Sequence, residues 1–258
     1  MKLGFIGMGN MAKALATGFI NNKTCAATDI YAYAPNQQKL KANAELMGFQ
    51  PVNTPQELIK NVNVIIVACK PNQVEFVFKE LGDLPGELEI LSIAAGWSYE
   101  KYRHLVGNNA HIQCVMPNTP AMIGEGVFLM EETNTLTANT KKEITNLFDS
   151  IGTVVNLPSK LMGIGTAISG CGPAFVDMMI EAYADVAVQH GIPREQAYML
   201  VSTTIKGAAQ LQLETKQHPA VLKDQVCSPG GTTIRGVTAL EENGFRNACI
   251  QSINKIME

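Results

Sequence analysis

The 258-residue sequence is poor in charge: Asp, Glu, Lys and Arg make up 17% of it, against roughly 25% in an average soluble domain. Positive charge is not concentrated either, because 20 Lys and Arg stand against 23 Asp and Glu and no basic cluster stands out. The basic patch typical of nucleic-acid-binding proteins is missing, so we expect no nucleic-acid partner. With 46% hydrophobic residues, the chain also lacks the composition of a disordered protein.

Long apolar runs and clustered metal ligands are missing as well. No continuous apolar run reaches the ~18 residues of a membrane span, and residues 1–7 do not resemble a signal peptide. We therefore expect a cytoplasmic protein without a membrane partner. The six cysteines form no Cys-x-x-Cys pair and the four histidines no His-x-x-x-His pair. We predict reduced, mostly buried thiols and no metal site.

The first 158 residues alternate between short apolar runs and helical patterns. The run at 62–69 is almost continuously β-branched, which is typical of a strand buried on both faces of a parallel sheet. Strand–helix–strand alternation predicts a doubly wound α/β domain over residues 1–158. The expected strands are 2–7, 29–34, 62–69, 88–93 and 111–116, and the expected helices are 10–20, 37–47, 55–60, 71–81 and 98–106.

From residue 159 to residue 258 the strand patterns stop, and we predict an all-α domain. The segment 174–188 is apolar on more than one helical face, and such a helix must be buried. About 100 residues cannot easily bury it alone, so we predict dimerisation; the alternative is that the N-terminal domain covers it. The expected helices are 162–168, 174–189, 194–216, 219–226, 232–242 and 245–257.

A glycine loop at residues 7–12 follows the first predicted strand and opens the first predicted helix. It matches G-x-G-x-x-A: Gly7 permits a tight turn, Gly9 permits close approach of a pyrophosphate, and Ala12 permits close packing of helix on strand. The pyrophosphate is held by free N–H groups at the positive helix end. The pattern predicts a Rossmann-type dinucleotide site; a glycine turn without a ligand is the alternative.

The end of the second strand bears on the choice of nicotinamide cofactor. Asp29 has the spacing of an NAD-specific acid, but it begins that strand instead of ending it. Residues 34–37 contain no acid, and the amides of Asn36 and Gln37, with Lys39 nearby, suit a 2′-phosphate. We expect NADPH, with NADH as the alternative.

Two further strand ends, at residues 68–71 and 92–96, face the same edge of a parallel sheet, where ligands bind. Small residues there allow the nicotinamide and its ribose to lie flat on the backbone. Lys70 suits a ribose contact at this edge; a solvated lysine without a ligand is the alternative. The predicted cofactor-binding residues are Ile6, Gly7, Met8, Gly9, Asn10, Met11, Ala34, Asn36, Ala68, Lys70, Pro71 and Ala95.

A second glycine loop, Ser228-Pro229-Gly230-Gly231, precedes the helix that opens with Thr232 and Thr233. A glycine-rich helix start exposes N–H groups and suits a carboxylate, and the two hydroxyls suit a neighbouring nitrogen or oxygen. On spacing alone, a simple turn between helices has equal weight.

Residues 218–233 resemble the signature of the pyrroline-5-carboxylate reductase family. Further blocks of similarity follow in family order at 4–12, 70–71, 94–96, 116–120, 169–174, 239–241 and 244–246. Cys171 departs from the family, where Ser or Ala is common, and should be tolerated because it is small.

The resemblance implies reduction of 1-pyrroline-5-carboxylate to L-proline by NAD(P)H, the last step of proline biosynthesis. It implies that the loop at Ser228, with the amides of Gly230, Gly231 and Thr232, holds the carboxylate. Thr233, the candidate catalytic residue, would hydrogen-bond the ring nitrogen. The family forms homodimers that often assemble into decamers.

Two other functions compete with this interpretation. A β-hydroxyacid dehydrogenase requires a lysine on the helix between its domains, and residues 162–175 contain none. A non-catalytic dinucleotide-binding protein would account for the first glycine loop but not for the second.

Overall fold

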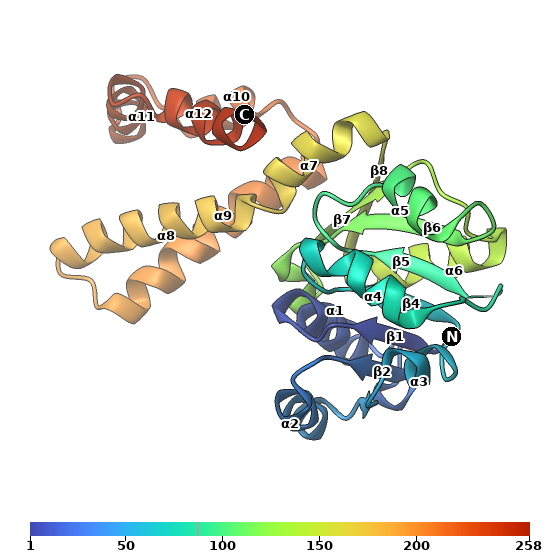
Figure 1. Cartoon of the computed structure of the whole chain (residues 1–258). Coiled ribbons are helices and arrows are strands. Elements are labelled where there is room, and N and C mark those ends of the chain that lie inside the picture. Colours follow the sequence, from blue (N-terminus) through green and yellow to red (C-terminus); the bar gives the residue numbers. More distant parts are fainter. Residues whose placement is uncertain (87) are drawn as a thin grey trace. The chain divides into compact units, whose positions relative to one another are not determined.

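The computed structural model describes residues 1–86 and 88–258 and divides the chain into two compact units, Met1–Pro173 and Ala174–Glu258. The first unit is built on a sheet and the second is helical (Figure 1). The α/β domain followed by a helical domain is thereby confirmed. The exact domain boundary at residues 158 and 159 stays a prediction.

The sheet of the first unit has eight strands within the described residues, in the order β3-β2-β1-β4-β5-β6-β7-β8. Neighbouring strands are parallel, except that β7 runs antiparallel to β6. The strands are β1 (Leu3–Ile6), β2 (Ile30–Tyr33), β3 (Gln50–Pro51), β4 (Val64–Val67), β5 (Glu89–Ser92), β6 (His111–Met116), β7 (Gly126–Glu131) and β8 (Gly152–Leu157).

The central strands are apolar throughout because helices cover both faces of the sheet. Successive side chains point to opposite faces, so Phe5 joins one hydrophobic cluster and Ile6 the other. One face packs against α1 (Asn10–Asn21), α2 (Gln37–Met47) and α6 (Ala138–Asp149). The other face packs against α3 (Pro55–Ile59), α4 (Val74–Leu81) and α5 (Tyr99–Val106).

The sequence analysis did not assign β3, β7, β8 or α6. Strand β8 (GTVVNL) has no buried position and only two adjacent apolar residues in its middle, so it carries no long apolar run. Helix α6 does carry a local signal, because the Thr137 side chain caps it and Ile144, Leu147 and Phe148 share one buried face.

A buried amide links distant parts of the first unit. Asn118, between β6 and β7, is 5% exposed. Its Oδ1 accepts a hydrogen bond from the Val127 N–H at 2.8 Å, and its Nδ2 donates to the Ser169 carbonyl at 3.0 Å. Ser169 is the last residue of α7 (Met162–Ser169). The loop after β6 therefore holds the end of α7.

The predicted helices of the second half are confirmed, with small differences at their ends. After α7 come α8 (Gly172–Gln189), α9 (Arg194–Thr215), α10 (Pro219–Gln225), α11 (Thr232–Glu242) and α12 (Phe245–Met257). Proline or glycine stands at the start of several of them, including Pro219 in α10 and Gly231 before α11.

The helical unit leaves most of its apolar side chains uncovered in the single chain. Its buried hydrophobic residues are Ala184 and Ala197, while residues such as Met178, Val186 and Met199 are exposed. By length and composition alone, the helical stretch Ser159–Gln189 is also apolar enough to cross a membrane. A long, uncovered apolar helix is equally what a subunit interface requires.

Candidate active site

The first glycine loop makes a tight connection between β1 and α1. Gly7 has φ +97°, its N–H donates to the Tyr33 carbonyl at 2.7 Å, and a Cβ there would lie 2.8 Å from the Ala68 carbonyl oxygen. Gly9 has extended backbone angles and caps α1, and nothing lies within 4 Å of the position of its Cβ. Gly7 is therefore required by the fold, whereas Gly9 leaves space beside the helix N-terminus.

That space is part of a cleft of about 510 Å³ at the carboxyl ends of β1, β2 and β4. Eight predicted cofactor residues line it: Ile6, Gly7, Met8, Gly9, Ala34, Asn36, Ala68 and Lys70. The other four, Asn10, Met11, Pro71 and Ala95, are not among its lining residues. Asn10 and Met11 belong to the first turn of α1, whose N–H groups have no partner within the helix.

The β2 end of the cleft offers donors to an anion. The Asn36 Oδ1 accepts a hydrogen bond from the Lys39 N–H at 2.9 Å and caps α2, which leaves the Asn36 NH₂ group as a donor. Gln37 differs from our expectation, because its Nε2 already donates to the carbonyls of Ala34 and Val52. Asn36 and Lys39 line the cleft and Gln37 does not.

The β4 end of the cleft is formed by Ala68, Cys69 and Lys70. Burial raises the pKa of the Cys69 thiol, which keeps it a neutral lining group. Pro71, the next residue, does not line the cleft. Its carbonyl accepts a hydrogen bond from the Trp97 indole N–H at 2.9 Å.

Several cleft residues were missed by the sequence analysis, among them Tyr33, Asn43, Gln73, Phe76 and Glu80. Asn43 lies on α2, and Phe76 and Glu80 lie on α4. Only the tertiary fold brings these two helices to the same cleft. An acid, Glu80, thus lies in the cleft although no acid follows β2 in the sequence.

A buried carboxylate supports the loop after β5, which carries Ala95. Glu131 on β7 is 2% exposed, and its Oε2 accepts a hydrogen bond at 2.9 Å from the N–H of Tyr99, the first residue of α5. Burial, and then the neighbouring Glu131, raise the pKa of the Cys114 thiol. Glu131 and Cys114 line a small cavity of about 230 Å³ together with Gly96 and Met116.

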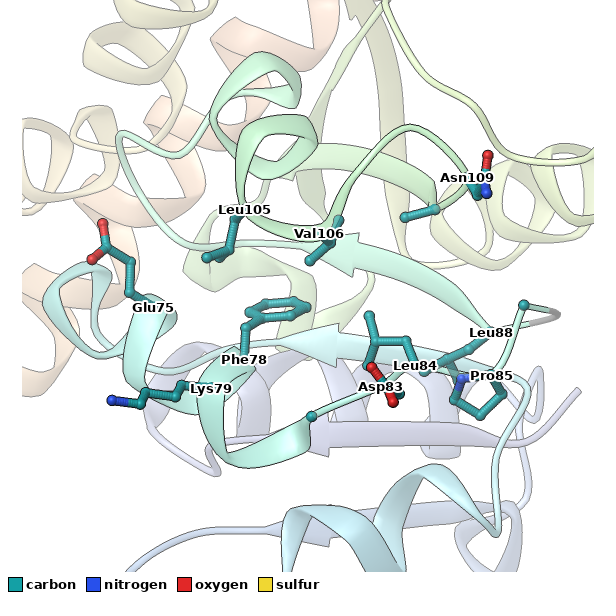
Figure 2. Close-up of a pocket in the computed structure, with 13 residues that line it drawn as sticks. Glu75, Phe78, Lys79, Asp83, Leu84, Pro85, Leu88, Leu105, Val106 and Asn109 are labelled. Atoms are coloured by element: carbon teal, nitrogen blue, oxygen red, sulfur yellow. The ribbon is translucent and has the colours of Figure 1, made fainter.

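Another cavity, of about 480 Å³, lies where the chain enters β5 and β6 (Figure 2). Its described lining includes Phe78, Leu88 and Val106, with Glu75 and Lys79 at its side. It adjoins the amino ends of these strands, and none of the described residues that line it is a predicted site residue.

The second glycine loop lies in the helical unit. The Gly231 N–H donates to the Ser228 carbonyl at 3.0 Å, and Gly230 has φ +68°. A Cβ on Gly231 would overlap the Ser228 Oγ, so that side chain would have to rotate, whereas Gly230 is favoured by the left-handed backbone of the turn. Thr232 and Thr233 open α11 and are exposed, and no acid lies in its first turn. Gly231 differs from our expectation, because its N–H is already taken by the Ser228 carbonyl. The N–H groups in the first turn of α11 and the two threonine hydroxyls remain available to an anion.

Two family models match this chain, and each matched region contains one of the two glycine loops. Residues 2–96 match the model described as NADP oxidoreductase coenzyme F420-dependent. Residues 159–258 match the model described as pyrroline-5-carboxylate reductase dimerisation.

Relatives match over nearly the full chain. The pyrroline-5-carboxylate reductase of Escherichia coli (strain K12) is 37% identical over 258 residues, which is 100% of this chain and 96% of that protein. The crystal structure of the Plasmodium falciparum enzyme with NADP bound has a TM-score of 0.91 at 32% identity, covering 99% of this chain and 95% of that one. The Streptococcus pyogenes enzyme has a TM-score of 0.87 at 30% identity, covering 99% and 98%.

Proposed function

This chain belongs to the pyrroline-5-carboxylate reductase family, and from that premise we propose which residues carry the reduction of 1-pyrroline-5-carboxylate to L-proline. The observation that carries the function is the full-length match to reductases of this name. The protein is an oxidoreductase of proline biosynthesis that binds a nicotinamide dinucleotide and forms a homo-oligomer. A β-hydroxyacid dehydrogenase would need a lysine that residues 162–175 lack, and a non-catalytic binding protein would leave the second glycine loop without a role.

The glycine loop fits the cofactor pyrophosphate. Gly9 leaves room for a phosphate at the N-terminus of α1, and the N–H groups of Asn10 and Met11 bind it. Lys70 contacts a ribose from the end of β4, and Ala95 lies beneath the nicotinamide. When bound, the reduced nicotinamide supplies the hydride.

We propose NADPH as the preferred cofactor. Its 2′-phosphate meets the free Asn36 NH₂ group and the Lys39 ammonium, both in the cleft. Among the described residues that line the cleft, Glu80 alone is acidic and disfavours added negative charge, and it comes from α4 instead of the end of β2. The preference therefore depends on the phosphate lying close to Asn36.

The second glycine loop suits the substrate carboxylate. The N–H groups of Gly230 and Thr232 hold it, while the Gly231 N–H donates to the Ser228 carbonyl and fixes the turn. Thr233 hydrogen-bonds the ring nitrogen. Because a protonated imine is already a good electrophile, these residues act mainly by positioning, and an alcohol is too weak an acid to be required as the proton source.

We propose a homodimer as the basic assembly, with a decamer built from five such dimers as the larger one, and a cytoplasmic location. The uncovered apolar side chains of α8 and α9 support the dimer. All six cysteines are free, which fits a reducing compartment. No nucleic-acid or membrane partner is needed for this function.

Steady-state kinetics with 1-pyrroline-5-carboxylate and either NADPH or NADH test the proposal. We expect turnover with both and a higher kcat/KM with NADPH. Asn36→Asp keeps the cap of α2 but places a negative charge beside the 2′-phosphate. Two unit charges 4 Å apart interact by about 1 kcal/mol in water and about 4 kcal/mol near a protein surface, so NADPH affinity should fall at least about fivefold.

The matched control for Asn36→Asp is Gln38→Glu, which adds the same charge to α2 at an exposed position that does not line the cleft. It should leave the NADPH preference unchanged. No turnover with either cofactor would refute the function, whereas a higher kcat/KM with NADH would refute only the cofactor assignment.

A further inference from the structure

The loops that follow β4 and β5 begin at the same edge of the sheet. The two strands pair in parallel as far as Val67 and Ser92, and one more bond runs from the Ile93 N–H to the Val67 carbonyl at 3.0 Å. Beyond this bond the ladder ends. The spacing between the loops at residues 68–73 and 94–98 therefore has to be set by other contacts.

A tryptophan side chain supplies such a contact. Trp97 is the only tryptophan in the sequence, and its indole N–H donates to the Pro71 carbonyl at 2.9 Å. Within the part of the chain that the structure describes, this is the one hydrogen bond that joins residues 68–73 to residues 94–98. The spacing of the two loops thus depends on one side-chain donor.

The Trp97 ring is held in place by the residues beneath it. It packs on Tyr102 of α5, with the ring centroids 4.9 Å apart. Tyr102 is fully buried, and its hydroxyl oxygen accepts a hydrogen bond from the Ser92 hydroxyl at 2.8 Å. Because the ring rests on a fixed neighbour, the direction of the indole N–H is fixed as well.

The turn that carries Ala95 is closed by its own backbone. The Ala94 N–H donates to the Ser92 Oγ at 3.2 Å, and the Trp97 N–H donates to the Ala94 carbonyl at 3.2 Å. Gly96 has φ +74°, a conformation that glycine supplies in tight turns. Ala95 and Gly96 are exposed at the top of this turn. A shift of Trp97 would therefore move the turn and Ala95 with it.

We propose that Trp97 is a positioning residue for the nicotinamide half of the cofactor. Its indole links the loop of Lys70, which contacts a ribose, to the loop of Ala95, which lies beneath the nicotinamide; the inference rests on these placements in the proposed function. Trp97 does not line the cofactor cleft, so it acts through the two loops. Without the link, the free protein would adopt several loop spacings, and binding would have to restore one of them.

Trp97→Phe tests the link, because it removes the indole donor and keeps an aromatic ring on Tyr102. Titration calorimetry is carried out with NADPH and with adenosine 2′,5′-bisphosphate, which lacks the nicotinamide and its ribose. Loss of one neutral hydrogen bond should weaken NADPH binding roughly 2- to 12-fold. The bisphosphate should bind the variant as it binds the wild type, because it does not reach the loop after β5.

A second measurement needs no nucleotide. The amide of residue 97 closes the turn, so its hydrogen exchange in the free protein reports how often the turn opens. After correction for the intrinsic rates of Trp and Phe, exchange should be roughly 2- to 12-fold faster in Trp97→Phe. In the reductase assay kcat should fall while the KM for 1-pyrroline-5-carboxylate stays unchanged, since the second glycine loop holds the substrate carboxylate.

Ser98→Ala is the matched control. The Ser98 Oγ accepts a hydrogen bond from the Lys101 N–H at 3.4 Å and caps α5, so this variant also removes one hydrogen bond from the same segment. The indole bond to Pro71 remains. Ser98→Ala should melt at a lower temperature but keep the wild-type affinities for NADPH and the bisphosphate.

The outcomes separate the role of Trp97 from the cofactor function. If the wild-type protein binds neither nucleotide, the proposed cofactor function fails. If Trp97→Phe changes neither affinity, or weakens both by the same factor, Trp97 is not a positioning residue and the cofactor function stands. A Ser98→Ala variant that weakens NADPH alone as much as Trp97→Phe does would show that any loosening of this segment has the same effect, and would overturn the specific role of Trp97.

Discussion

Replacing each of the two loop glycines by alanine should separate cofactor binding from stability. At Gly9 the backbone is extended (φ −80°, ψ −170°), so alanine adopts it without strain, and the new methyl group meets no protein atom within 4 Å. Glycine is a better N-cap than alanine, and the change costs roughly 0.5–1 kcal/mol. We therefore expect Gly9→Ala to unfold at nearly the wild-type temperature.

The same methyl group occupies the space where the pyrophosphate approaches the N-terminus of α1. Displacing the phosphate breaks at least one hydrogen bond to a charged group, worth about 1.5–3 kcal/mol. The dissociation constant for NADPH should rise roughly 10- to 150-fold. At Gly7, in contrast, alanine must adopt φ +97° and would approach the Ala68 carbonyl oxygen at 2.8 Å.

The backbone strain at Gly7 costs about 1–3 kcal/mol before the steric clash is added. For a chain of this size, roughly 2–4 °C of melting temperature is lost per kcal/mol, so Gly7→Ala should melt several degrees lower. Thermal unfolding by circular dichroism and NADPH titration by fluorescence measure the two effects. Wild-type NADPH affinity in Gly9→Ala, or a large loss of its stability, would refute the reasoning.

Two further predictions concern the helical unit. Thr233→Ala should lower kcat roughly 10- to 150-fold without abolishing turnover or altering the pH profile, and Thr233→Ser should restore most of it; a complete loss would make Thr233 the proton donor. Because α8 and α9 expose so many apolar residues, we expect their helices to interlock between two subunits, and sedimentation at low micromolar concentration should show a dimer or larger assembly. A stable monomer at that concentration would contradict the interlocked arrangement.

Local signals in the sequence were sufficient for much of the fold. The glycine loop, the β-branched run at β4 and the proline and glycine residues between helices each act within a few residues, and those elements are confirmed. Strand β7 carries an apolar run at residues 127–130 that the sequence analysis did not use, whereas β8 depends on pairing. β7 pairs antiparallel with β6 and β8 pairs with β7, and neither pairing leaves a clear local pattern.

The residues of the candidate site fall into the same two groups, those with a local sequence signal and those placed only by the tertiary fold. The glycine loop and the ends of β2 and β4 were predicted because a strand end is a local feature. Phe76 and Glu80 could not be, because α4 reaches the cleft only in the folded domain. The predicted phosphate contact of Gln37 was wrong because it also depends on the tertiary fold. The amide donors of Gln37 bind the carbonyls of Ala34 and Val52.

The hydrogen bond from Asn118 to Ser169 has a consequence for building chimaeras of this protein with its relatives. In a continuous helix the Ser169 carbonyl would accept from the residue four positions later, but that residue is Pro173, which has no N–H. Asn118 supplies the missing donor from a loop 51 residues earlier in the chain. A crossover after Pro173 keeps the donor, the acceptor and the proline together. A crossover at residue 158 would take Asn118 from one parent and Ser169 with residue 173 from the other. If the second parent has no proline at 173, the N–H of that residue and the Asn118 amide would compete for the Ser169 carbonyl.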